Sequence, residues 1–367
     1  MKKVLFLIHD LGHGGAEKVL VNLVNNMDPL QFDITVMALF GGGVNEQFLK
    51  PHIHYKTVFN KTFPGNSHLM KLFSPKRLHK WFIKEHYDIE IAYLEGPDAR
   101  IISGCCDKET KKIAWIHCTM KTPKETALGF KSVNEAKKCY GKMDTIVFVS
   151  ESNRDAFIAS CPYNGRMQVL YNTNETDTIL ALAKEDTKLP KQVLCWCGVG
   201  KIVPVKGFDR MIRIQKRLIE EGYKTHLCIF GEGNQKAELE KFADNYGIAD
   251  SVTFFGYQTN PYKYVKRCSL FVCASHSEGF STATTEALIL GTPVVTTLVS
   301  GMKELLGENN EWGIVTENNE EALYQGMKQL IDDPKLLAHY KNKAAERGNN
   351  FSTEKTVEAV EKMLMNM

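Results

Sequence analysis

Several features that mark common classes of protein are missing from this 367-residue sequence. No apolar run approaches the roughly 18–20 residues that a membrane-spanning helix requires. The apolar run at residues 4–9 is too short for a signal peptide, and no small-residue cleavage site follows it. The sequence also contains no Walker loop and no nucleophile elbow. We therefore expect a globular chain whose first apolar run is a buried strand.

Patterns typical of metal sites and disulfides are missing as well. The ten cysteines form no Cys-x-x-Cys pair, and Cys195, Cys197, Cys228, Cys268 and Cys273 lie in or beside apolar runs. This favours buried free thiols over a zinc site and indicates a reducing, cytoplasmic location. No Asp-x-Asp pair offers carboxylates to Mg²⁺ or Mn²⁺. The sequence thus predicts no bound metal and no cofactor.

Charge is nearly balanced overall but unevenly distributed. The net charge is +3, with +6 on residues 1–172 and −3 on residues 173–367. Residues 47–84 contain seven lysines, one arginine and no carboxylate. Because this basic excess is local, we expect no nucleic-acid partner.

Short apolar runs alternate with helical patterns, and the alternation restarts once. The first series of apolar runs comprises residues 4–9, 32–39, 89–94, 113–117 and 146–150. The second series comprises residues 193–197, 226–230, 252–256, 270–274 and 294–297. Such alternation predicts parallel sheets covered on both faces. We therefore predict an α/β chain with two Rossmann-like, doubly wound parallel-sheet domains that face each other across a cleft.

The polar segment 171–190 separates the two series and is the predicted hinge. This assigns residues 1–172 to the first domain and residues 188–351 to the second. The last segment, residues 352–367, is predicted to be a helix that packs on one of the domains. Ligands of open parallel sheets bind at the carboxyl ends of the strands, so the loops that follow strands are the candidates for function.

The strongest motif follows the strand at residues 270–274. Glu278 lies on the loop, and Glu286 lies inside the next helix. Between them come Gly279, Phe280, Ser281 and Thr282. Ser281 or Thr282 can cap the helix, whose free amides can accept an anion. One carboxylate beside a helix start suits a ligand with hydroxyls and phosphates, whereas the alternative is a solvated loop Glu followed by an ordinary helical Glu.

Three further loops carry candidates of lower specificity. Lys201 and Lys206 lie after the first strand of the second domain, where two lysines can neutralise a diphosphate or simply be solvated. Gly14 and Gly15 follow the first strand of the chain and open a helix. A dinucleotide site is disfavoured there, because Glu17 stands at the third glycine position.

His117 ends a predicted strand and would point into the cleft, although a lone histidine is more often structural. Gly231 and Glu232 end another strand and precede a helix.

Taken together, these motifs resemble retaining glycosyltransferases of the GT-B fold, family 4, over nearly the whole chain. The Gly-Gly-Ala-Glu stretch at 14–17 is similar to that family's glycine loop, and residues 200–207 are similar to its basic phosphate motif. Residues 278–286 have its Glu-x7-Glu spacing, followed by Gly-Thr-Pro-Val-Val at 291–295. Lys201 departs from the family's usual Arg, which removes a bidentate fork but keeps the charge.

The resemblance implies a role for each matching residue. Glu286 would hold the ribose of the donor nucleotide, and Glu278 would contact the donor sugar. Lys201 and Lys206 would bind the diphosphate, and His117 would touch the sugar ring near the reacting carbon. The implied catalytic residues are thus His117 and Glu278. The remaining donor-binding residues are amides near Gly14 and Gly15, amides of Gly279, Phe280, Ser281 and Thr282, and base contacts from Gly231, Glu232 and Tyr257.

The implied activity is metal-independent, configuration-retaining transfer of a sugar from a nucleotide-sugar donor, expected to be a UDP-sugar. The implied acceptor is a glycan or a lipid-linked acceptor in surface polysaccharide or glycolipid synthesis. The second domain would bind the donor, and the first would lie on the acceptor side. Two alternatives stay open: a nucleotide-sugar epimerase of the same fold, and a non-catalytic nucleotide-sugar-binding protein.

The basic segment at residues 70–84 supports a further hypothesis. Lysines interleave there with Leu, Phe and Trp. This pattern is typical of a surface that docks on anionic lipid, which would make the chain a peripheral protein on the inner face of the membrane. The alternative is a helix that packs its apolar side on the sheet and leaves its lysines in solvent.

Overall fold

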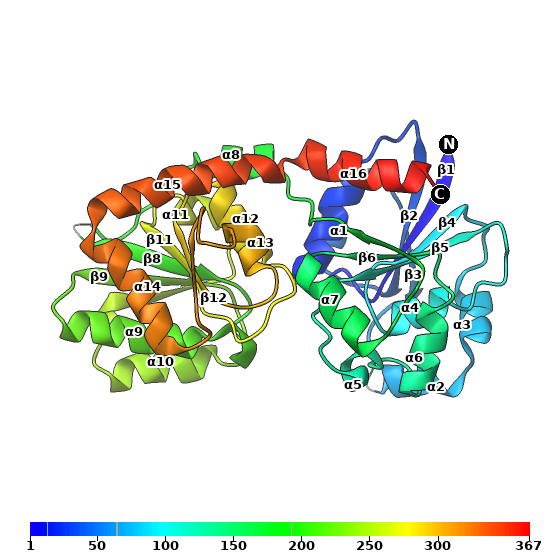
Figure 1. Ribbon diagram of the computed structural model, residues 1–367, viewed down its shortest axis with the longest axis horizontal. Helices are drawn as coiled ribbons and strands as arrows, with labels where there is room; N and C mark the ends of the chain where they lie inside the picture. Colours follow the sequence, from blue (N-terminus) through cyan, green and yellow to red (C-terminus); the bar gives the residue numbers. More distant parts are fainter. Residues whose placement is uncertain (13, 64, 192) are drawn as a thin grey trace. The chain divides into compact units, whose positions relative to one another are not determined.

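The computed structural model describes residues 1–12, 14–63, 65–191 and 193–367, which form two compact units (Figure 1). The first unit comprises Met1–Asn174 together with Thr353–Met367, and the second comprises Glu175–Ser352. Within the described residues no helix combines the length and apolar character that a membrane crossing requires.

The first unit is built on a seven-stranded parallel sheet in the order β3-β2-β1-β4-β5-β6-β7. Its inner strands are buried on both faces, which explains why they are continuous apolar runs in the sequence. Phe6 on β1, for example, lies beside Val36 on β2 and Ile91 on β4. The strands are β1 Lys2–Ile8, β2 Phe32–Phe40, β3 His54–Phe59, β4 Ile89–Ala92, β5 Lys111–Ile116, β6 Thr145–Phe148 and β7 Arg166–Val169.

Helices cover both faces of this sheet (Figure 1). Helices α1 and α16 pack on each other, and the Lys2 ammonium donates to the Leu364 carbonyl at 2.8 Å. Helices α3 to α7 form the opposite layer through successive contacts. The helices are α1 Gly15–Asn26, α2 Asn66–Leu72, α3 Pro75–Phe82, α4 Pro97–Ile102, α5 Pro123–Thr126, α6 Val133–Tyr140, α7 Glu151–Ser160 and α16 Thr353–Met365, with a 3-10 turn at Glu46–Phe48.

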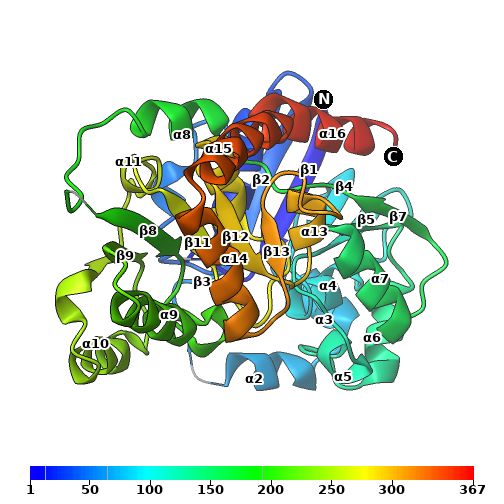
Figure 2. The ribbon, with the colours of Figure 1, turned by 60° about the vertical axis from the view of Figure 1, so that its left-hand side comes forward.

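The second unit has a six-stranded parallel sheet in the order β10-β9-β8-β11-β12-β13. Its strands are β8 Leu194–Val199, β9 Thr225–Phe230, β10 Val252–Gly256, β11 Leu270–Cys273, β12 Val294–Thr297 and β13 Ile314–Thr316. One layer of helices holds α9 Phe208–Glu220, α10 Lys236–Asn245 and α14 Glu320–Asp332. The other holds α8 Thr176–Leu182, α11 Tyr262–Val265, α12 Thr282–Ile289 and α15 Pro334–Gly348, while α13 Met302–Leu306 joins β12 to β13 (Figure 2).

The predicted pair of doubly wound parallel sheets is confirmed. The prediction missed the edge strands β3, β7 and β13, which are short or only half buried and therefore lack a continuous apolar run. The predicted hinge segment contains α8, whose Ile179 is buried and which contacts α11 and α12 of the second unit. Seven of the ten free cysteines are buried as expected, but Cys106 and Cys118 are exposed.

The basic segment forms two helices instead of one, because Ser74 caps α3 and Pro75 occupies its first turn. Arg100 on α4, which is only 1% exposed, holds this segment through hydrogen bonds to its backbone. Its guanidinium donates to the carbonyls of Met70 at 3.0 Å and Phe73 at 2.6 Å. It also forms a bidentate pair with the Glu135 carboxylate at 3.0 and 3.1 Å. One buried cation therefore joins α2, α4 and α6.

We expect Arg100→Ala to lower the free energy of unfolding by about 3–5 kcal/mol, because it leaves a buried carbonyl, a part-buried carbonyl and the Glu135 carboxylate without their partner. Arg77→Ala, an exposed change on α3, should alter the free energy by less than about 0.5 kcal/mol. Urea unfolding followed by tryptophan fluorescence measures both. Equal stability of the two variants would contradict this role of Arg100.

Candidate functional site

The loops that follow β8, β9 and β11 meet at the carboxyl edge of the second sheet, because these three strands are neighbours. Two glycines allow the loops to approach closely. A β-carbon on Gly207, whose φ is 66°, would lie 2.2 Å from the carbonyl oxygen of Ala274. A β-carbon on Gly231 would lie 1.9 Å from the carbonyl oxygen of Gly200. Any larger residue at either position would therefore push these loops apart.

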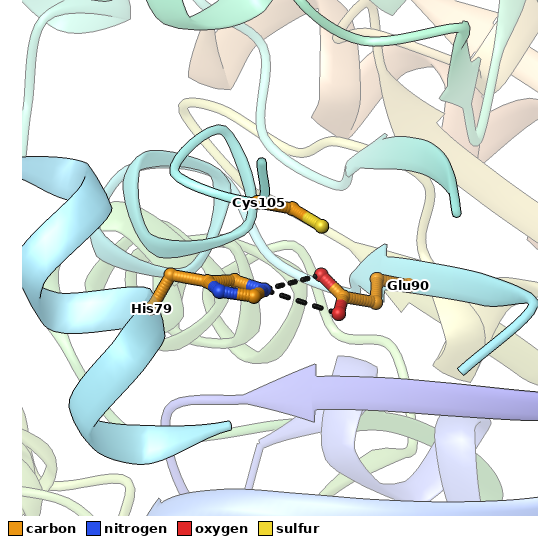
Figure 3. A group of neighbouring side chains, drawn as sticks. All are labelled: His79, Glu90 and Cys105. Carbon is orange, nitrogen blue, oxygen red and sulfur yellow. Dashed lines mark hydrogen bonds and ion pairs between the residues drawn. The ribbon is translucent and has the colours of Figure 1, made fainter. Parts of the chain in front are cut away.

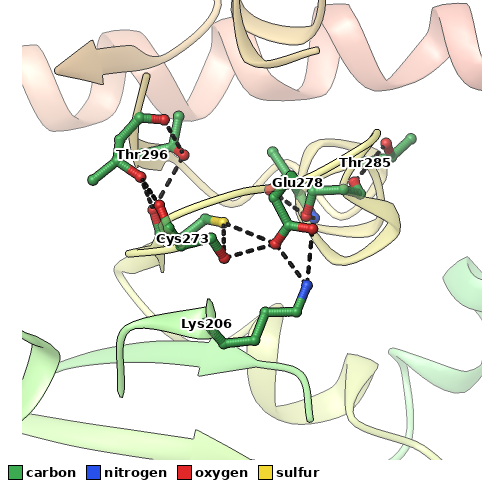
Figure 4. A network of polar contacts seen from close by, with 9 residues as sticks. Lys206, Cys273, Glu278, Thr285 and Thr296 are labelled. Carbon is green, nitrogen blue, oxygen red and sulfur yellow. Dashed lines mark hydrogen bonds and ion pairs between the residues drawn. The ribbon is translucent and has the colours of Figure 1, made fainter. Parts of the chain in front are cut away.

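Lys206 and Glu278 form the centre of this edge (Figure 4). The Lys206 ammonium donates to both carboxylate oxygens of Glu278, at 2.6 and 2.8 Å. The buried hydroxyl of Ser275 donates to the Glu278 Oε1 atom at 2.6 Å. The Glu278 side chain is only 10% exposed, whereas that of Lys206 is 29% exposed. The carboxylate is thus held from two sides, and the ammonium keeps a face toward solvent.

Glu286 lies on the next helix, α12, and is 8% exposed. Its carboxylate accepts a hydrogen bond from the Tyr262 hydroxyl at 3.0 Å. Ser281 caps the helix, because its hydroxyl accepts from the Thr284 amide at 3.3 Å, and the Thr285 hydroxyl donates to the Ser281 carbonyl at 3.1 Å. The sequence prediction of Ser281 or Thr282 as the cap is therefore resolved in favour of Ser281.

The other predicted residues of this unit differ in exposure. Lys201 is exposed and has no ion-pair partner among the described residues. The Glu232 carboxylate pairs with the Lys236 ammonium at 2.8 Å, one helical turn away. Tyr257 is exposed on the loop after β10.

Phe280 is buried beneath Gly301, where a β-carbon would lie 2.9 Å from the Phe280 ring. Gly279 and Thr282 flank the Phe280–Ser281 pair and are half buried. The segment from Gly279 to Thr282 therefore leads into the first turn of α12, and the Phe280 side chain packs inside the unit.

In the first unit, Gly14 precedes α1 and Gly15 is its first residue. The Glu17 side chain folds back over this helix start, since a β-carbon on Gly14 would lie 1.9 Å from the Glu17 Oε2 atom. The positive end of α1 is thus faced by a carboxylate of the same helix. Gly14 and Gly15 leave backbone amides near this point, as predicted for an anion, but the structure places Glu17 beside them.

His117 directly follows β5 in the first unit and is buried. Its amide donates to the Glu95 carboxylate at 3.0 Å, and its ring packs against Tyr93 at 4.8 Å between centroids. The ring Nε2 atom has no hydrogen-bond partner within the described part of the chain. Burial lowers the pKa of His117 to about 4, and the nearby Glu95 carboxylate only partly offsets this. The imidazole is therefore neutral at neutral pH.

Several residues that support the site were missed from the sequence. Ser275 orients Glu278, Tyr262 orients Glu286, and Glu95 holds the backbone of His117. Asn153 is fully buried and donates to the His117 carbonyl at 3.2 Å. Glu95 could have been found as the first charged residue after the apolar run 89–94, whereas Tyr262 and Asn153 come from distant helices and give no local signal.

Asp98 is a further buried acid in the first unit that the sequence did not indicate. It is 1% exposed, and burial, with smaller effects of Glu95 and Asp10, holds its pKa well above the usual range. The neutral form of its carboxyl group is therefore favoured, and the residue lies in the first turn of α4, which begins one residue before it.

Two family models match the chain. The model for glycosyl transferases group 1 matches residues 182–347, and the model for glycosyltransferase family 4 matches residues 13–177. The chain is 28% identical over 375 residues to an N-acetylgalactosaminyltransferase of Campylobacter jejuni that acts on a diphospho-undecaprenol-linked sugar, and the match covers 100% of both chains.

Solved structures share the fold over the full length. Anabaena HepE in complex with UDP and glucose matches with a TM-score of 0.79 at 18% identity, covering 100% of both chains. A sucrose-phosphate synthase of Thermosynechococcus elongatus matches with a TM-score of 0.81 at 16% identity, covering 100% of this chain and 99% of that one. These similarities confirm the expected GT-B fold class.

The neutral state of His117 predicts a specific pH dependence of stability. Because its folded-state pKa of about 4 lies below the ordinary value of 6.5, the unfolded chain binds a proton first as the pH falls. As the pH falls from 6.5 to 4, the free energy of unfolding of the wild type should therefore decrease by about 3 kcal/mol more than that of His117→Gln. Unfolding free energies of the two proteins at several pH values measure this difference. Parallel pH profiles would show that His117 titrates normally.

Proposed function

The chain belongs to the group 1 and family 4 glycosyltransferases, and on that basis we propose that it transfers a sugar from a UDP-sugar to a lipid-linked or polysaccharide acceptor with retention of configuration. The Campylobacter jejuni relative, which is similar over its full length, acts by its name on a lipid diphosphate-linked sugar. The HepE structure holds UDP and glucose, which favours UDP-sugars as the first donors to test. Family membership favours transfer over the epimerase and binding-protein alternatives.

The observation that carries this proposal is the contact between Lys206 and Glu278 at the carboxyl edge of the second sheet. An ammonium that is partly exposed can turn to a diphosphate, whose two charged groups compete with one carboxylate for it. Glu278 would then lose its ion pair and become available to donor hydroxyls. The hydrogen bond from the Ser275 hydroxyl would keep its carboxylate oriented. Donor binding and orientation of Glu278 would thus be coupled through a single lysine.

Breaking the bond between sugar and nucleotide places negative charge on the departing diphosphate. Lys206, Lys201 and the amides at the start of α12 would stabilise that charge. Glu286, fixed by Tyr262, would hold the ribose hydroxyls, and Gly231, Glu232 and Tyr257 would contact the base. We propose that this cationic set makes the reaction independent of a metal ion, and that the leaving phosphate accepts the proton of the acceptor.

In the first unit we propose that the neutral imidazole of His117 offers its Nε2 atom to the donor sugar. Glu95 and Asn153 position it by holding its backbone amide and carbonyl. A neutral ring is suited to this role, because a protonated one would repel the positive charge that develops on the sugar. The amides near Gly14 and Gly15 would complete the phosphate contacts if Glu17 turns aside.

The helices α2 and α3 support the proposed docking on anionic lipid. Leu72 is 72% exposed and Trp81 is 46% exposed. Four basic side chains lie exposed beside them, and within the described residues none of the four has a carboxylate partner; they are Lys76, Arg77, Lys80 and Lys84. Exposed apolar side chains next to unpaired cations suit the interface of an anionic bilayer. We propose that this surface brings a cytoplasmic enzyme to its lipid-linked acceptor at the inner face of the membrane.

Donor binding is tested by thermal shift with UDP-, GDP- and ADP-sugars in EDTA. One donor should raise the melting temperature, because a ligand at 100 times its Kd increases the free energy of unfolding by about 2.7 kcal/mol. Lys206→Met and Glu286→Gln should each weaken binding about 10- to 100-fold, because each removes a charge-assisted contact. The exposed Lys241→Met and Glu238→Gln are the matched controls. No shift with any donor, or a shift only with divalent metal, would refute the proposed site.

Membrane docking is tested by flotation with vesicles that contain anionic phospholipid. Reversal of Lys76, Arg77, Lys80 and Lys84 to Glu should weaken binding at least about 100-fold, because each basic residue near the surface contributes about 1 kcal/mol. The control carries the same charge change on four exposed lysines of the second unit, Lys188, Lys191, Lys224 and Lys241. Equal flotation of the two variants would remove α2 and α3 as the docking surface.

A further inference from the structure

Three potential metal ligands meet inside the first unit, on segments that the proposed reaction does not use (Figure 3). His79 comes from α3, Glu90 from the inner strand β4, and Cys105 from the turn after α4. One ligand atom from each, the imidazole nitrogen, a carboxylate oxygen and the thiol sulfur, lies within 4.8 Å of the other two.

The cluster is enclosed by the fold. The Glu90 side chain is 3% exposed and that of His79 is 15% exposed. The His79 Nε2 atom lies 2.8 Å from one Glu90 oxygen and 3.0 Å from the other. Glu90 is a charged residue on a strand between β1 and β5, where apolar residues are the rule. A buried carboxylate in such a place requires a cationic partner.

We propose that His79, Glu90 and Cys105 bind a zinc ion, with the fourth position left to water. Imidazole, carboxylate and thiolate are all ligands that Zn²⁺ accepts in tetrahedral sites. The thiolate disfavours Mg²⁺ and Ca²⁺, which take oxygen ligands. Figure 3 shows the three side chains converging from different directions, as ligands of one ion do.

Binding an ion would require the ligand atoms, which now lie within 4.8 Å of one another, to move closer to tetrahedral spacing. With bonds of about 2.0–2.2 Å to nitrogen and oxygen, two ligands of a tetrahedral ion lie about 3.4 Å apart. The His79 nitrogen would therefore retreat by about half an ångström from its present 2.8 Å. His79 lies on a short helix and Cys105 in a turn, so both can shift while Glu90 stays fixed by the sheet.

The proposed ion would join α3, β4 and the turn after α4, and so would hold the basic helix α3 against the sheet. This site does not depend on the proposed donor site, because the cations proposed to bind the donor are lysines of the second unit. Without the ion, the same three residues form a His–Glu pair beside a thiol. The metal-bound and metal-free forms would differ in whether the Cys105 sulfur is a metal ligand, which a spectroscopic probe can detect.

The test uses the full chain without an affinity tag, stripped with a chelator and titrated with Co²⁺ as a spectroscopic probe. Cys106→Ser and Cys118→Ser are introduced first, because these are the two exposed thiols. We expect one Co²⁺ per chain with a thiolate charge-transfer band and intense tetrahedral bands, all displaced by Zn²⁺. The further substitution Cys105→Ser should abolish the charge-transfer band and weaken Zn²⁺ binding more than about 100-fold. Even the loss of a residue that only contacts a metal ligand typically lowers the metal affinity 10- to 100-fold.

Cys105→Ser keeps the His79–Glu90 pair, so the variant should fold, and its melting temperature without metal serves as the control. Zn²⁺ should raise the melting temperature of the parent but not that of the Cys105→Ser chain. The proposal is overturned if the parent shows no thiolate band, or if the Cys105→Ser chain keeps both the band and the Zn²⁺ affinity.

Discussion

The ion pair between Lys206 and Glu278 is the contact on which the proposed chemistry depends. It places an ammonium where a diphosphate is expected and a carboxylate where sugar hydroxyls are expected, and each group is the partner of the other. A carboxylate with only 10% of its side chain exposed would be costly without such a partner. The two opposite charges therefore stabilise each other at this edge of the sheet, and in the proposed reaction a diphosphate would compete with Glu278 for the Lys206 ammonium.

The parallel sheet explains why these residues meet. All six strands of the second sheet run in the same direction, so the loops after β8 and β11 share one edge. Gly207 lets the loop that carries Lys206 touch the backbone at Ala274, four residues before Glu278. The same principle places His117 and Glu95 together in the first unit, since β4 and β5 are neighbours.

Buried charge also organises the region around α2 and α3. Arg100 holds the carbonyls of Met70 and Phe73, and the Glu90 carboxylate holds His79. These contacts fix the inner side of the two helices, while Leu72 and the basic side chains stay outside. One segment thus combines an inner face held by buried polar contacts with an exposed face that we propose docks on anionic lipid.

The sequence by itself determined the two alternating series of strands and helices and the loops that carry Glu278, Lys206 and His117. These signals are local: apolar runs, capping residues and glycines at strand ends. The tertiary structure alone decided the pairing of Lys206 with Glu278, of Tyr262 with Glu286, and of His79 with Glu90. It also decided the half-buried edge strands such as β3. These features join residues far apart in the chain, and the physical reason is that sheet order and helix packing, which no local pattern encodes, set the distances between them.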